Sequence, residues 1–247
     1  MKVFPVDEIL KKPLNDEQHF ILSTAHAFEK GFEGYKAIAI CDEQLNAVIP
    51  FVQINSKVKT FESLPFSWHS QWKLTGDLKQ KVNQVIEKTK ASLIMFSSMT
   101  AVQFDFHHAL IQNGFTYSEM PSDVLYLSGK HFEEIFASNF SVKVRNQCRK
   151  ALKSGMQISL KKSPALIHEY YKLYLQATDS WGKKNPPYPE KFFNEVILKN
   201  DDVDFWVSEL DGKFLGGVIV LKYNGWLYYW SGMINREYSS MCINNGL

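Results

Sequence analysis

Five basic residues within eleven positions could bind an anion in the segment SVKVRNQCRKALKSG, residues 141–155. They are Lys143, Arg145, Arg149, Lys150 and Lys153. Ser141 and Gly155 are typical of the two ends of a helix. Arg145 and Arg149 would lie one turn apart on that helix, and two guanidinium groups so placed suit bidentate contact with phosphate or carboxylate. The alternative is a solvated helix whose cations interact favourably with the helix dipole.

The apolar residues of this helix predict which cations face a ligand. Four of them fall on one stripe, because successive residues of a helix turn by about 100°. They are Val144, Cys148, Ala151 and Leu152. Burial of the stripe would leave Arg145 and Arg149 at its rim, and we expect them, with Lys150, to bind an anionic substrate in a cleft between two units of the chain. Lys143 and Lys153 are expected to face water.

An aromatic segment, WLYYWSGM at 226–233, predicts a strand that could line the same site. Alternation along a strand puts Tyr228 and Trp230 on one face, and Tyr229 and Ser231 on the other. Core packing is the alternative interpretation of such a run. The residues expected to bind substrate are Arg145, Arg149, Lys150, Trp181, Tyr188, Tyr228 and Trp230.

Other residues with catalytic chemistry give weaker signals. Glu209 could act as a general base if it faces the cleft, but no catalytic residue is assigned. His107 and His108 are adjacent, so on a helix they point about 100° apart and cannot share a metal ion. We therefore expect no metal site.

The elements that must position these residues follow a repeated plan. Segments 35–54 and 203–223 each predict two strands around a polar turn, and the second has the hairpin signal Asp211-Gly212. The other expected helices cover 77–90, 105–115, 164–181 and 189–199, and the other expected strands cover 91–96, which would be buried, and 123–128. In helix 164–181 the expected apolar face consists of Ile167, Tyr170, Tyr174, Ala177 and Trp181.

Composition limits the class of protein. The 247 residues are 45% hydrophobic and 14% aromatic, which fits an ordered fold, and the net charge of only +2 argues against a protein that coats nucleic acid. The three cysteines have no metal-type spacing and favour a reducing compartment. The sequence shows no cleavable leader and no run of about 18 apolar residues. We therefore expect a cytoplasmic protein without a transmembrane segment.

The basic segment also resembles a known family. SVKVRNQCRKALKSGMQI is similar to the pattern Ser-x-Lys-x-Arg-x-x-x-Arg-Lys-Ala-x-Lys-x-Gly of bacterial FemAB-like and related GNAT-type acyltransferases. The segments YYKLYLQATDSWGKKNPPYPEKFFNEVI and WVSELDGKFLGGVIVLKYNGWLYYWSGM resemble the helix pair, hairpin and strand that follow in that family. The similarity covers residues 115–247. The first hundred residues share the layout, with SLPFSWHSQW similar to a loop of these proteins.

The resemblance implies an α/β (α+β) fold, with tandem GNAT-like mixed sheets flanked by helices. The first unit would occupy residues 1–140, and the linking helices with a truncated second unit would occupy 141–247. It implies transfer of an acyl group from acetyl-CoA or another acyl-CoA, or from aminoacyl-tRNA, to an amine of a cell-envelope precursor or sugar, in peptidoglycan or polysaccharide biosynthesis. The strand at 226–233 would supply backbone N–H groups for the oxyanion. The alternative is a non-catalytic module whose basic helix holds an anionic ligand or a nucleic acid such as tRNA.

Overall fold

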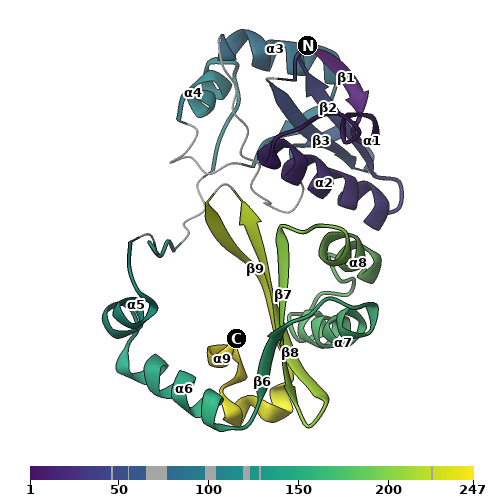
Figure 1. Cartoon of the computed structure of the whole chain (residues 1–247). Helices are drawn as coiled ribbons and strands as arrows, with labels where there is room; N and C mark the ends of the chain where they lie inside the picture. Colours follow the sequence, from purple (N-terminus) through teal and green to yellow (C-terminus); the bar gives the residue numbers. More distant parts are fainter. Residues whose placement is uncertain are drawn as a thin grey trace. The chain divides into compact units, whose positions relative to one another are not determined.

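A computed structural model describes residues 1–45, 47–54, 56–64, 77–97, 104–118, 123–127, 129–223 and 225–247. The chain divides into two compact units, each built from two segments (Figure 1). The first unit contains Met1–Ser118 and Tyr188–Asn200, and the second contains Glu119–Pro187 and Asp201–Leu247. The expected boundary after residue 140 lies within the second unit.

The first unit has a five-stranded sheet in the order β1-β2-β3-β4-β5. The strands are β1 (Lys2–Pro5), β2 (Lys36–Cys41), β3 (Val48–Ile54), β4 (Thr60–Glu62) and β5 (Leu93–Met95). Neighbours are antiparallel except β4 and β5, which are parallel, so the sheet is mixed. The helices are α1 (Val6–Ile9), α2 (Asp16–Gly31), α3 (Leu78–Thr89), α4 (Phe104–Gln112) and α8 (Glu190–Leu198).

Helix α2 is fixed at both ends by local chemistry. Asn15 and Gln18 form a capping box, in which each side chain accepts a hydrogen bond from the other residue's backbone N–H. At the other end, a Cβ on Gly31 would lie 2.7 Å from the Cα of Phe192, so only glycine permits this approach of α8. The rings of Phe28 and Phe192 pack with their centroids 4.5 Å apart. Helix α8 therefore belongs to the core of the first unit.

The second unit has a four-stranded antiparallel sheet in the order β6-β7-β8-β9. The strands are β6 (Gln157–Leu160), β7 (Val203–Leu210), β8 (Lys213–Tyr223) and β9 (Trp226–Ile234). Its helices are α5 (Phe132–Asn139), α6 (Val142–Lys153), α7 (Pro164–Ser180), the 3₁₀ helix η2 (Arg236–Met241) and α9 (Ile243–Gly246). The β7–β8 turn uses Asp211 and Gly212, both with positive φ, as the hairpin signal requires.

Different helices cover the two faces of this sheet. Helix α7 buries Ile167, Tyr170 and Tyr174, and the ring of Tyr170 packs edge-on against Phe205 of β7, so we call this side the α7 face. On the opposite side a small cluster joins α6 and α9 to the sheet. It consists of Ala151, Met156, Leu215 and Ile243.

The structure confirms most of the expected elements. The two hairpins form as β2–β3 and β7–β8, and the two sheets flanked by helices give the expected mixed α/β fold. Helices α3, α4, α6, α7 and α8 and strand β9 lie where the sequence predicts them.

Three expectations about strands and loops need correction or fall outside the described residues. Residues 123–127 form no strand, because a strand needs a neighbour to complete its hydrogen bonds and this segment has none among the described residues. Strand β5 forms, but Leu93 and Met95 are exposed and not buried. Ser128 and most of the SLPFSWHSQW loop lie outside the described residues.

Candidate functional site

Strand β9, the last strand in the order of the second sheet, carries a bulge near its middle. Ile219 of β8 lies opposite Ser231, but the next residue, Val220, lies opposite Tyr229, so Trp230 is an extra residue in β9. A bulge bends the strand and changes the direction of its side chains, and bulges are common next to active sites. The simple alternation predicted for Tyr228 to Ser231 is therefore interrupted.

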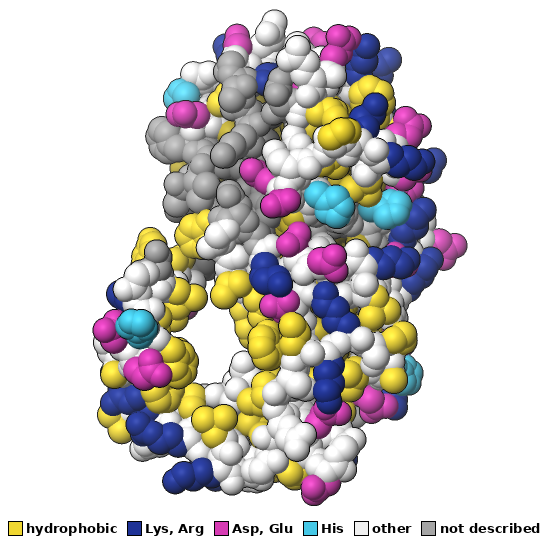
Figure 2. All heavy atoms as spheres, viewed as in Figure 1, with side chains coloured by type: hydrophobic (Ala, Val, Ile, Leu, Met, Phe, Trp, Pro, Cys, Tyr) yellow, Lys and Arg dark blue, Asp and Glu magenta, His cyan; other side chains and the backbone are white. Residues whose placement is uncertain are grey.

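The sheet face opposite α7 is open near this bulge. Phe205 faces α7, so the next residue of β7, Trp206, faces the opposite side. Leu160 and Val218 lie directly opposite Trp206 on the neighbouring strands and therefore share that side. Val220 lies two residues after Val218 in β8 and so faces the same side, and Tyr229 lies directly opposite Val220. Tyr229 therefore lies on this side as well. Leu160, Trp206 and Tyr229 are all exposed. We call these residues the open face. Figure 2 shows an opening between this part of the sheet and helices α5 and α6, and hydrophobic side chains border it.

The side chain of Tyr229 lies over a glycine. A Cβ on Gly232 would lie 2.2 Å from the Tyr229 hydroxyl, so the phenol crosses a position that only glycine leaves vacant. Tyr229 is nevertheless 58% exposed, which makes it accessible to a ligand. Partial burial raises the pKa of the Tyr229 hydroxyl, and that of Tyr228, above the ordinary value. Both phenols therefore stay protonated at neutral pH and act as hydrogen-bond donors.

A buried hydrogen bond supports β9 from its other side. The hydroxyl of Tyr170 on α7 lies 2.7 Å from that of Ser231. Tyr170 is fully buried, and burial is the main cause that raises its pKa. This bond ties the bulged part of β9 to helix α7.

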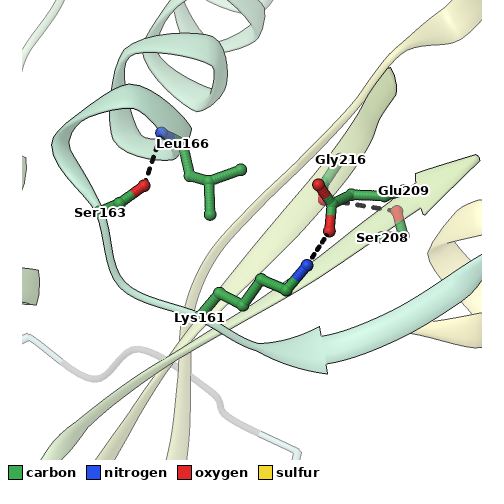
Figure 3. Close-up of polar contacts among 6 residues, drawn as sticks. All are labelled: Lys161, Ser163, Leu166, Ser208, Glu209 and Gly216. Carbon is green, nitrogen blue, oxygen red and sulfur yellow. Dashed lines mark hydrogen bonds and ion pairs between the residues drawn. The ribbon is translucent and has the colours of Figure 1, made fainter. Parts of the chain in front are cut away.

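A second concave region lies on the α7 face at the β7–β8 hairpin. The groove has a volume of about 460 Å³, and Glu209 and Lys213 line it together with Glu169 and Lys172 of α7. Glu209 forms an ion pair with Lys161, as Figure 3 shows. Figure 3 also shows that Ser208, the neighbour of Glu209 in β7, donates a hydrogen bond to the Gly216 carbonyl, and that Ser163 caps α7 through the N–H of Leu166.

Glu209 does not meet the bulge of β9. Glu209 lies opposite Phe214, whereas the bulge lies opposite Ile219 and Val220. Five residues along a strand span about 16 Å, so Glu209 cannot act directly on a group bound at Tyr229. The groove and the open face are separate regions of the second unit.

The two arginines of the basic helix contact α5. Nη1 of Arg145 donates to the carbonyls of Ala137 and Phe140, at 2.7 Å and 2.6 Å, and so caps the C-terminal end of α5. The guanidinium of Arg149 lies over the ring of Phe136, 5.9 Å from its centroid, and donates to Asn146. Lys143, Lys150 and Lys153 are exposed.

The apolar stripe expected on this helix is wrong at one position. Ala151 is fully buried, because Gly246 of α9 packs closely against it, but Leu152 is 66% exposed. The two residues are adjacent, so their side chains point about 100° apart, and one small contact cannot cover both.

The remaining residues expected to bind substrate lie on different elements, and Tyr188 belongs to the first unit while the others belong to the second. Trp181 is 56% exposed and does not belong to the apolar face of α7, because it lies at the helix C-cap, where the helical repeat ends. Tyr188 stacks on Phe192 in the first unit. Tyr228 and Trp230 are half-buried on β9; by alternation Tyr228 shares the α7 face with Leu221.

Sequence reasoning missed the residues that form the open face. Leu160, Trp206 and Gly232 were not considered, and Tyr229 was assigned only to the face opposite Tyr228. Gly232 directly after WLYYWS was the available signal, because a glycine in a strand often marks close approach of another group. Among the residues that the structure describes, no group of histidine, cysteine and acidic side chains could hold a metal ion.

A comparison with protein-family models finds a similarity in the C-terminal part of the chain. Residues 138–245 match the family model described as "Acetyltransferase (GNAT) domain". This part of the chain is therefore similar to GNAT-type acetyltransferase domains. A comparison with curated protein sequences gives no significant match.

Solved structures extend the similarity to the fold of the whole chain. The crystal structure of FemX aligns over 100% of this chain and 83% of its own, with a TM-score of 0.62 and 12% identity. A conserved protein of unknown function from Bacteroides thetaiotaomicron aligns over 91% of this chain and 76% of its own, with a TM-score of 0.56 and 10% identity. The resemblance to FemAB-like and GNAT-type proteins is thus confirmed. None of the described helices is long and apolar enough to span a membrane.

Proposed function

We propose that this protein is an N-acyltransferase whose chemistry takes place on the open face beside β9. In such a reaction the amine nitrogen of the acceptor attacks the acyl carbon, a C–N bond forms, and the C–S or C–O bond of the donor breaks. The nitrogen loses a proton and the leaving group gains one. The single observation that carries the proposal is Tyr229, an accessible and protonated phenol next to the β9 bulge of a domain similar to GNAT-type domains.

Each part of the open face has a separate task. The hydroxyl of Tyr229 donates a hydrogen bond to the acyl oxygen or to the leaving sulfur or oxygen, where negative charge develops. Leu160 and Trp206 provide an apolar surface for the acyl chain and exclude water from the reacting atoms. Tyr170 and Ser231 hold the bulge in place from behind and do not touch the substrate.

Acetyl-CoA, another acyl-CoA or an aminoacyl-tRNA is the proposed donor, and a cell-envelope precursor or an amino sugar is the proposed acceptor. The proposed donors carry phosphate groups, for which Arg149 and Lys150 on α6 are the proposed contacts. Arg145 has a different part, because its Nη1 already binds the end of α5. Because these donors are made in the cytoplasm, we propose that the protein works there.

The experiment compares two tyrosine variants in an acyl-transfer assay. Purified protein is incubated with acetyl-CoA or aminoacyl-tRNA and a panel of amino sugars and peptidoglycan precursors, and the acylated product is measured by mass spectrometry. Tyr229→Phe should lower the rate by about 100-fold, the usual scale for a lost proton donor. Tyr126→Phe is the matched control, since Tyr126 is also exposed but lies outside the sheet.

Equal rates for the two variants would show that Tyr229 is not part of the chemistry. The same samples test the second candidate function, a non-catalytic module that binds an anion through α6. The exposed lysines of that helix favour this candidate. Binding of tRNA that weakens steeply with salt, without transfer to any acceptor, would support it against the transferase.

A further inference from the structure

One row of residues on the open face runs straight across the four strands of the second sheet. Leu160 of β6, Trp206 of β7, Val218 of β8 and Gly232 of β9 lie directly opposite one another on neighbouring strands. Opposite residues share a face, so these four form one line, which we call the apolar row. None of the four side chains carries a charge, and the indole N–H of Trp206 is their single hydrogen-bonding group.

The row begins at the proposed proton donor. A Cβ on Gly232 would lie 2.2 Å from the Tyr229 hydroxyl and 3.3 Å from a methyl group of Val218. The Tyr229 hydroxyl therefore lies over the β9 end of the apolar row. An acyl oxygen that accepts a hydrogen bond from Tyr229 places the first carbons of its chain at this end.

The neighbouring residues of the same face favour one direction for the rest of the chain. On one side, Ile158 of β6 and Ile234 of β9 pack against the cluster that joins α6 and α9 to the sheet. On the other side, Asp204 lies two residues before Trp206 and forms an ion pair of 2.8 Å with Lys222. An apolar chain over this pair would remove water from two charges, which is unfavourable. The chain is therefore directed along the apolar row, toward β6.

The length of the row sets the length of the chain. Neighbouring strands lie about 4.8 Å apart, so the steps from β9 through β8 and β7 to β6 span about 14 Å. An extended alkyl chain advances about 1.25 Å per carbon, as follows from a C–C bond of about 1.52 Å and an angle of about 111°. A chain of about eight carbons thus reaches Trp206, and one of about eleven carbons reaches Leu160.

The chemistry of the row distinguishes the donors. An acetyl group is too short to contact Trp206 or Leu160, both of which are exposed. An aminoacyl group carries an ammonium charge, and no side chain of the apolar row can pair with it. A saturated chain covers both exposed side chains and leaves no polar group without water.

We propose that the donor is a thioester of a straight, saturated acyl chain of about eight to twelve carbons, which lies along the apolar row. The inference rests on the proposed acyl-transfer function and names the donor of that reaction. The thioester carbonyl lies at Tyr229, and the end of the chain covers Trp206 and Leu160. As in the proposed function, the acceptor nitrogen bonds to the carbonyl carbon, the C–S bond breaks, and the sulfur leaves as the thiol after it gains a proton.

The test measures binding and transfer with a series of donors on the full chain. Acetyl-, butanoyl-, decanoyl- and hexadecanoyl-CoA are titrated by calorimetry. Transfer from each of them, and from alanyl-tRNA, to the panel of amino sugars and peptidoglycan precursors is measured by mass spectrometry. Leu160→Ala removes the far end of the row. Leu175→Ala is the matched control, because Leu175 is 40% exposed, close to the 48% of Leu160, but lies on α7 at the other face of the sheet.

Decanoyl-CoA should bind the wild type about 200-fold more tightly than acetyl-CoA, because each CH₂ group that is covered on one side strengthens binding about twofold. The gain should end beyond about twelve carbons, where the row ends. Leu160→Ala should weaken binding of decanoyl-CoA about fivefold and that of butanoyl-CoA by less than about twofold. Leu175→Ala should bind decanoyl-CoA as the wild type does.

The inference is overturned if decanoyl-CoA binds no more tightly than acetyl-CoA, or if the two leucine variants weaken its binding equally. A steady gain up to hexadecanoyl-CoA would also overturn it, since the chain would then partition onto apolar surface without a defined end. Preferred transfer from acetyl-CoA or alanyl-tRNA would overturn the chain length and leave the acyltransferase function intact. The absence of transfer from every donor would overturn the acyltransferase function, and the binding series would still decide whether the apolar row holds the chain.

Discussion

The strands β1, β2, β3 and β4 follow one another across the sheet of the first unit, and β6, β7, β8 and β9 do the same in the second. Each set is formed by a strand, two helices and three further strands in chain order. The sheets differ at the fourth strand. In the first unit β4 pairs with β5, while among the described residues of the second unit β9 pairs only with β8.

Strands β2 and β3 of the first sheet are also more buried than strand β9 of the second. Consecutive residues of β2 and β3 are buried, so helices or loops cover both faces of these strands. Residues of β9 alternate between exposed and half-buried over most of its length, and Leu227 and Tyr229 are exposed. One strand plan thus gives a closed core in the first unit and an accessible surface in the second. A large substrate can bind to the second sheet more easily than to the first, because side chains of the second sheet are already exposed and need not move.

The largest expected effect is on the free energy of unfolding, and it comes from a comparison of one side chain in each sheet. Phe51 of β3 is fully buried and packs edge-on against Phe61 and Phe96. Phe51→Ala should lower the free energy of unfolding by about 3–5 kcal/mol, through lost burial and the resulting cavity. Leu227→Ala on β9 should change it by less than about 0.5 kcal/mol. Urea unfolding followed by circular dichroism measures both, and equal losses would show that β9 is covered in solution.

The next comparison uses the same substitution at two glycines. Gly31→Ala would force the backbone of α8 away from α2, because the new Cβ meets the Cα and Cβ of Phe192. We expect a loss of about 1–3 kcal/mol in stability. Gly232→Ala meets first the end of the Tyr229 side chain, which is free to move. Gly232→Ala should therefore lower stability less than Gly31→Ala does, and it should reduce acyl transfer. Thermal unfolding measures both variants, and a larger loss of stability in Gly232→Ala would contradict the comparison.

The smallest effect concerns the basic helix α6. Arg145→Ala removes two charge-assisted hydrogen bonds to the end of α5 and should lower stability by about 1 kcal/mol, since the site is partly exposed. Lys153→Ala, on the same helix, should have no measurable effect on stability. Hydrogen exchange should be faster in α5 of the arginine variant only. Identical exchange in the two variants would show that Arg145 does not hold α5.

Most of the secondary structure could be predicted because its signals are local. Ser141, Ser163 and Asp77 cap their helices through bonds to a backbone N–H three residues on, so each start depends on neighbours in sequence. Asp211 and Gly212 set their hairpin in the same way. The repeated hairpin plan was enough to predict two sheets flanked by helices, of which only the first is mixed.

The surfaces were decided by contacts between residues far apart in the sequence. The sequence determined that Leu152 and Ala151 lie on one helix, but the cluster with Leu215 and Ile243, together with Gly246, decided that Ala151 is buried and Leu152 is not. The amphipathic pattern predicted that Arg145 would bind a substrate, which stays a prediction, and only the fold shows that its Nη1 also donates to the end of α5. On β9, the pairing with β8 inserts the bulge at Trp230 and directs Tyr229 to the open face. Periodicity describes one isolated element, and the side of it that is buried depends on which other elements fold against it.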